Sequence, residues 1–247
     1  MAQVTGAPSV DYSLSAMVLA AVSINHPDFV PQNYQIFLLT IMIMLIHACI
    51  SSMPTKWIAN FNSVGSTFNI IALFIVIITI PAATNRESQG LPKFALTHVV
   101  WGNFYAGTDF PKGVALLMAF VAVIWTMRSV SVFGATTILH MLTLYCSGYD
   151  APFHLSEETS NARMNSPRAI VLTSGIGGLF GWFLQLVVAY TVVDINAVLG
   201  SDLGQPWASY LLQVLPQKTA VALLALTIIC SFSMGQGCMV GRHVPFV

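Results

Sequence analysis

Apolar residues dominate the chain in segments of about 20 residues, the length that an α-helix needs to cross roughly 30 Å of hydrocarbon. Short polar stretches rich in proline and glycine separate these segments. The strict alternation of apolar and polar positions that is typical of membrane β-strands is absent. The pattern therefore predicts an all-α polytopic membrane protein in a lipid bilayer. The predicted spans are residues 10–24, 34–53, 61–81, 113–127, 169–193 and 219–240.

Three polar stretches separate the later spans. Residues 84–112 form the longest of them, and we expect its aromatic side chains at a membrane–water interface. Residues 159–168 and 194–218 are expected to be polar loops, with Trp207 at the interface. Lysine and arginine are shared equally between alternate loops, so their distribution indicates no orientation.

Composition supports a membrane protein and gives no sign of a nucleic-acid partner. Of the 247 residues, 56% are hydrophobic and 7% are charged, whereas about 25% are charged in soluble domains. Nine basic residues offset nine acidic ones, so no charge excess points to nucleic acid. The N-terminus lacks the pattern of a cleavable signal peptide. The cysteines lie in apolar surroundings without C-x-x-C spacing, and we expect small buried side chains rather than disulfides or zinc ligands: Cys49, Cys146, Cys230 and Cys238.

The sequence offers no metal site, cofactor motif or catalytic arrangement. His47 and His154 have no further ligands at metal spacing, so both are expected to be satisfied buried histidines. Gly235-x-Gly237 lies in an apolar helix, which favours close packing or a bend over a dinucleotide site. An intramembrane enzyme using Asp150, His154 and Glu157 is a weaker alternative. It would need a second carboxylate or a metal set on a facing helix, and the other spans supply none.

One stretch, residues 147–158, combines features that are unfavourable in the hydrocarbon core of a membrane. Gly148 and Pro152 are helix breakers four residues apart, with the ionisable Asp150 between them. Broken backbone survives at membrane depth only inside protein or beside a water-filled cavity, and an intramembrane carboxylate points to function. Two half-helices that meet here would form a transporter-like binding site. The alternative is an ordinary loop that begins at Gly148.

The same stretch resembles the sixth-helix region of fungal amino acid, GABA and choline permeases, of the amino acid–polyamine–organocation (APC) superfamily. The resemblance starts at Trp125-Thr126 and covers 148–158, 160–162 and 167–170. It continues through Gly178, Gly181 and Trp182, and residues 19–24 with Pro27-Asp28-Phe29 resemble the end of that family's third helix.

This resemblance implies a fragment of an inverted-repeat, LeuT-like transporter fold, covering roughly helices three to eight of about twelve. It implies secondary transport, by symport or exchange, of amino acids or related amino compounds such as GABA, choline or polyamines. A proton is the implied coupling ion, and the plasma membrane the implied location, with vacuolar or other internal membranes as alternatives. The implied substrate-binding residues are Trp125, Thr126, Ser147, Gly148, Tyr149 and Asp150.

The chain also departs from the family. The first unwound helix, which supplies half of the substrate site, has no counterpart, so a truncated, non-transporting membrane protein is the alternative. Asn69 stands about where related bacterial transporters carry a coupling lysine. Residues 128–146 separate two segments that the family joins, 113–127 and 147–158, and we interpret them as a retained intron. We also interpret the tail, residues 241–247, as retained intron sequence.

Overall fold

The computed structural model describes residues 2–26, 28–102, 110–115, 117 and 162–240, and its regular secondary structure over these residues is entirely helical. The predicted all-α class is confirmed for this part of the chain. The main helices are α1 (Ala2–Asn25), α2 (Asn33–Ser51), α3 (Thr55–Ala83), α8 (Ala162–Thr191) and α11 (Gln217–Val240). Shorter helices are η1 (Arg86–Gln89), α4 (Thr97–Gly102), α9 (Ile195–Leu199) and α10 (Pro206–Val214).

Four described segments have the length and apolar composition to cross a membrane: Ala7–Asn25, Asn33–Ser51, Thr55–Ala83 and Gln217–Met239. They occupy the positions at which the hydrophobic pattern predicts the first three spans and the last one. A shorter apolar segment, Leu179–Thr191, forms the C-terminal part of α8. Most of the predicted span 113–127, the stretch 147–158 and the proposed intron 128–146 lie outside the described residues.

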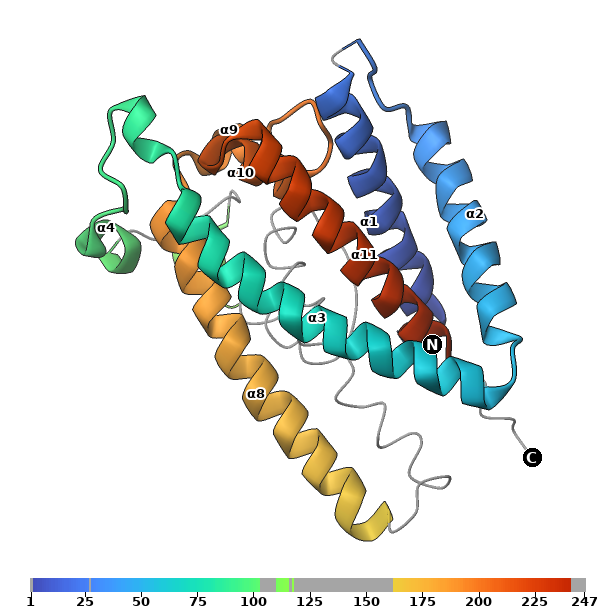
Figure 1. The fold of residues 1–247 in the computed structure, drawn as a ribbon. Coiled ribbons are helices and arrows are strands. Elements are labelled where there is room, and N and C mark those ends of the chain that lie inside the picture. Colours follow the sequence, from blue (N-terminus) through green and yellow to red (C-terminus); the bar gives the residue numbers. More distant parts are fainter. Residues whose placement is uncertain (1, 27, 103–109, 116, 118–161, 241–247) are drawn as a thin grey trace.

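Tight turns make the first three helices run in alternating directions. The Gln32 backbone N–H donates to the Gln35 side chain at 2.9 Å at the start of α2. Between α2 and α3, the Pro54 carbonyl accepts from the Trp57 backbone N–H at 2.9 Å, which starts α3 one residue after the proline. Proline suits the residue before a helix because its φ is already close to helical and its missing N–H is not needed there. Helix α1 packs against both α2 and α11, and the three lie side by side in Figure 1.

The predictions of polar loops at residues 159–168 and 194–218 are wrong in part. Residues 162–168 belong to α8, because Ala162, Arg163 and Met164 favour helix and extend it ahead of the apolar span. Within 194–218, helices α9 and α10 form, and Trp207 is buried at 0% exposure rather than interfacial. Its burial follows from helix packing: the Gln205 side chain caps the start of α10, and the Trp207 ring stacks on Tyr210 with centroids 5.4 Å apart.

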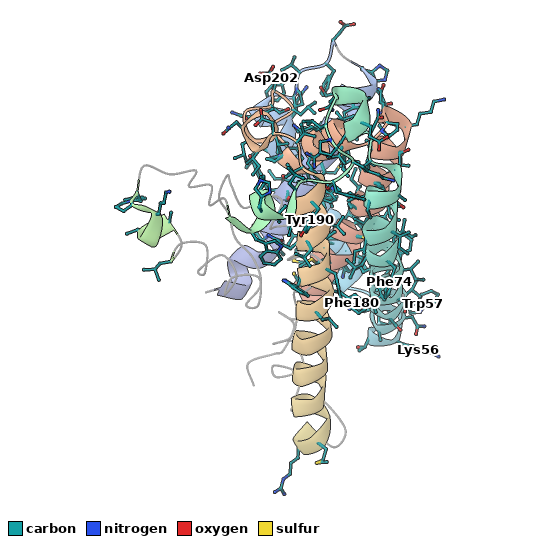
Figure 2. All side chains as sticks on the ribbon, turned by 90° about the vertical axis from the view of Figure 1, so that its left-hand side faces the viewer. Lys56, Trp57, Phe74, Phe180, Tyr190 and Asp202 are labelled. Carbon is teal, nitrogen blue, oxygen red and sulfur yellow. The ribbon has the colours of Figure 1, made fainter. Side chains whose placement is uncertain are left out.

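The main hydrophobic core lies at the end of the bundle that carries α9 and α10. Side chains of α1, α3, α8, α10 and α11 meet there. Its buried members include Met17, Val76, Leu184, Trp207 and Leu224. Farther along α8, Phe180 contacts Phe74 of α3 edge to face with ring centroids 5.0 Å apart, and both are labelled in Figure 2.

Large apolar side chains also cover the outward faces of α2 and α3, as expected where a helix meets lipid or further helices. Phe37 and Leu45 of α2 and Ile70 and Ile78 of α3 are each more than half exposed. Cys49 is exposed at the end of α2, so its expected burial is wrong, whereas Cys230 is buried and Cys238 partly buried. The apolar character of the α2 surface explains why Cys49, a small apolar side chain, is accommodated there.

Candidate functional site

All six residues of the substrate site implied by the resemblance lie outside the described part of the chain. They are Trp125, Thr126, Ser147, Gly148, Tyr149 and Asp150. His154 and Cys146 lie outside it as well. The described residues contain a different polar site, formed by α1, α2 and α11.

That site centres on a contact between Asp11 of α1 and His47 of α2. Both side chains are at 0% exposure, and Asp11 Oδ1 lies 3.0 Å from His47 Nδ1. The two atoms are not aligned as a hydrogen bond, and neither Asp11 Oδ2 nor His47 Nε2 has a hydrogen-bond partner among the described residues. Buried polar groups without partners are uncommon in folded proteins, so each of them calls for an explanation.

Sequence spacing brings the two residues to the same depth. Asp11 precedes the end of α1 at Asn25 by fourteen residues, and His47 follows the start of α2 at Asn33 by fourteen. At 1.5 Å per residue, each lies about 21 Å along its helix from the turn that joins α1 to α2. Each residue is also four positions, about 6 Å, from the other end of its membrane-crossing segment, at Ala7 for α1 and at Ser51 for α2, so the pair lies toward one side of a span of about 30 Å. An ionisable group without a partner is costly inside such a segment, and the contact between the two groups lowers that cost.

Helix α11 closes the site with a glycine. A Cβ atom on Gly235 would lie 2.7 Å from Asp11 Oδ1 and 2.7 Å from His47 Cε1, closer than real side chains come. The expected close packing at Gly235 is confirmed, whereas a Cβ on Gly237 would meet no described residue within 4 Å. One turn before Gly235, the Phe232 ring lies with its centroid 4.5 Å from that of His47.

Further hydroxyl and amide groups line the three helices around the pair. The Ser15 hydroxyl donates to the Asp11 carbonyl at 2.7 Å, and the Thr40 hydroxyl lies 3.1 Å from Ser15 Oγ across the α1–α2 contact. Nearer the end of α2, Gln236 Nε2 donates to Ser51 Oγ at 2.9 Å. Polar side chains that bond between helices at membrane depth hold the helices in register.

The sequence predicts that His47 is buried, and this is confirmed. It also predicts that the ring nitrogens of His47 have hydrogen-bond partners, and this is wrong among the described residues. It did not single out Asp11. A signal was present, because Asp11 is the second residue of the first predicted span and an intramembrane carboxylate points to function. The pairing itself depends on how α1, α2 and α11 pack, which the sequence does not reveal.

The opposite end of the bundle is fastened by hydrogen bonds around the end of α8. The Tyr190 carbonyl accepts from Arg86 and from the Ala95 backbone N–H, both at 2.8 Å. Burial lowers the pKa of the Arg86 guanidinium from its ordinary value. Thr191 and Tyr210 share a hydrogen bond of 2.6 Å, and burial raises the pKa of the Tyr210 phenol.

These contacts tie α8 to α10 and to the segment after α3. The Gln213 side chain accepts from the backbone N–H groups of Val193 and Asp194 and donates to the Asp194 carbonyl. Figure 2 shows Tyr190 and Asp202 toward this end and Lys56 and Trp57 toward the other. The bundle therefore has one end held by many hydrogen bonds and an apolar core, and another where a buried ionisable pair lies between helices.

Comparison with known proteins identifies the family of the chain. The family model described as amino acid permease matches residues 1–244. The chain belongs to the amino acid permease family, in the APC superfamily.

Several fungal proteins are similar to nearly the whole chain. An "Uncharacterized amino-acid permease" of Schizosaccharomyces pombe is 50% identical over 241 residues, 97% of this chain and 40% of that protein. A Candida albicans protein named "Putative polyamine transporter" is 41% identical over 241 residues, 96% of this chain and 40% of that protein. The chain thus spans about two fifths of the length of these relatives. No solved structure matches the chain.

Proposed function

We propose that the whole protein to which this chain belongs is a secondary transporter of amino acids or related small amino compounds, working by symport or exchange. The observation that carries the proposal is the similarity over nearly the whole chain to amino-acid permeases and to a protein named as a polyamine transporter. The buried polar groups of α1, α2 and α11 support it, because polar groups at membrane depth mark substrate and ion pathways.

In this proposal, Trp125, Thr126 and residues 147–150 bind the substrate, and helix 113–127 continues directly into 147–158 once 128–146 is removed. Unwound backbone at Gly148 would supply free N–H and C=O groups to the substrate. The plasma membrane is the proposed location. A coupling proton is part of the proposal.

Uptake by cells tests this function. The full-length protein would be expressed with and without residues 128–146 in yeast lacking its own permeases, and supplied with labelled amino acids, GABA, choline and spermidine. We expect saturable uptake of at least one of these compounds by the form without 128–146, and none by the form that contains it. Failure of both forms, at a normal surface level, would favour a non-transporting membrane protein.

Replacing Asp150 with asparagine in the full-length protein should raise the substrate concentration needed for half-maximal uptake. The amino group of the substrate is cationic, and a carboxylate in a cavity within the membrane attracts it or holds the half-helices apart. The measurement is initial uptake at several substrate concentrations, with the surface level determined separately. Unchanged kinetics at equal surface level would place Asp150 in a solvated loop instead.

A further inference from the structure

Asp11 and His47 stand apart from every other residue of the described spans. In the four membrane-crossing segments that the structure describes, Asp11 is the only acidic residue and His47 the only histidine. Both are fully buried and in contact. An isolated ionisable pair at membrane depth is costly to keep unless it is used, and proton relays in membrane proteins are built from such residues.

Few other titratable or charged groups lie on the described helices around this pair. The remaining titratable or charged residues of α1, α2, α3 and α11 are Tyr12, Tyr34, Cys49, Lys56, Lys218, Cys230 and Cys238. The first five have exposed side chains, and Lys56 and Lys218 lie at the starts of their helices. Cys230 and Cys238 are buried and partly buried on α11, and thiols are weakly acidic. Among these groups, only Asp11 contacts the imidazole as an ion pair.

We propose that Asp11 and His47 form the proton-binding site of the transporter, with His47 Nε2 as the atom that takes up the proton. This inference rests on the transport function proposed above. Nδ1 faces the Asp11 carboxylate, whereas Nε2 has no hydrogen-bond partner among the described residues, so Nε2 is the nitrogen free to accept. Histidine is the side chain whose charge ordinarily changes between about pH 5 and 8.

Proton uptake and release balance in charge. In the empty state, the imidazole is neutral and the carboxylate carries the single negative charge. On uptake, an O–H bond of a hydronium ion on one side of the membrane breaks and an N–H bond forms at Nε2. The cationic ring then offsets the Asp11 carboxylate, so the loaded pair is neutral overall. Release to water on the other side is the reverse of this step.

Helix α11 covers the pair on one side, and in this proposal it is the helix that moves to admit a proton. Gly235 of α11 is so close that it leaves no room for a Cβ, and Phe232 of α11 packs on the imidazole. Next to Gly235, Gln236 Nε2 donates to Ser51 Oγ at 2.9 Å, so a movement of α11 at this point would have to break this hydrogen bond to α2. A shift of α11 at Gly235 would expose the pair, and neutralising it would favour closure.

Transport by the purified full-length protein in liposomes tests the site, using a substrate identified by the uptake screen. The membrane potential is held at zero, and a pH difference of about one unit is applied. Coupling to one proton then gives about tenfold accumulation of substrate, because a tenfold concentration ratio is equivalent to one pH unit. Exchange of labelled for unlabelled substrate at equal pH on both sides is measured in the same preparations.

We expect His47→Gln and Asp11→Asn each to abolish accumulation driven by the pH difference while preserving exchange at equal pH. Gly237→Ala serves as the control and should accumulate substrate as the unmodified protein does, since its Cβ meets nothing within 4 Å. Tenfold accumulation by both variants would overturn the assignment, and so would loss of exchange in both, which indicates a purely structural pair. If the unmodified protein neither exchanges nor accumulates any substrate, the proposed function itself fails.

Discussion

Replacing Gly235 with alanine in the full-length protein should reduce uptake about tenfold and lower its melting temperature in detergent. The added Cβ would lie 2.7 Å from both Asp11 Oδ1 and His47 Cε1, so one of these side chains or one of the three helices must shift. Overpacking of this kind costs about 1–3 kcal/mol, and a displacement of that energy is enough to change transport tenfold.

The matched control for this substitution is Gly237→Ala, two residues along the same helix. Alanine favours helix over glycine by about 0.5–1 kcal/mol, and this gain applies at both positions. Among the described residues, a Cβ on Gly237 meets nothing within 4 Å, so this variant should transport normally and melt at the same temperature or slightly higher. Equal uptake and equal melting of the two variants would mean that Gly235 does not confine the buried pair.

Replacing Gly148 with leucine should abolish uptake while leaving the amount of protein at the cell surface nearly unchanged. In the proposed site, Gly148 is the point at which the helix unwinds and its backbone contacts the substrate. A leucine side chain would fill this space and remove backbone conformations that glycine permits. The measurement is initial uptake of labelled substrate, with surface protein quantified in the same cells.

Gly113→Leu is the control for that variant, because a Cβ on Gly113 meets nothing within 4 Å among the described residues and Gly113 opens the same predicted broken helix. This variant should keep most of its uptake. Normal uptake by Gly148→Leu would contradict the unwound site and favour a loop that begins at this glycine.

The positions of the long helices could be predicted from the sequence because each apolar run has the length of a membrane crossing. The first three predicted spans and the last one fall on α1, α2, α3 and α11. The ends of the helices were harder to predict. Helix α8 begins at Ala162, ahead of the apolar run, since polar helix formers extend it where hydropathy gives no signal.

The short helices and the contacts between residues far apart in the chain also could not be predicted from the sequence. Trp207 carries the signature of an interfacial aromatic, yet α10 buries it against Tyr210, a tertiary contact that no local pattern encodes. In the same way, Asp11 and His47 are 36 positions apart and become one site only through the antiparallel packing of α1 and α2. Because Gly235 lies in an apolar helix, the sequence indicates that it is a packing residue. The sequence does not indicate which residues pack against it.

The most direct test of the central claim, that the full-length protein carries small amino compounds across a membrane, is counterflow in liposomes. Vesicles containing the purified protein are loaded with one unlabelled compound, and entry of a trace of the same labelled compound is followed at equal pH. The predicted result is transient accumulation of label for an amino acid, GABA, choline or a polyamine, abolished by Gly148→Leu. No accumulation for any of these compounds, by protein that shows cooperative thermal unfolding, would contradict the claim.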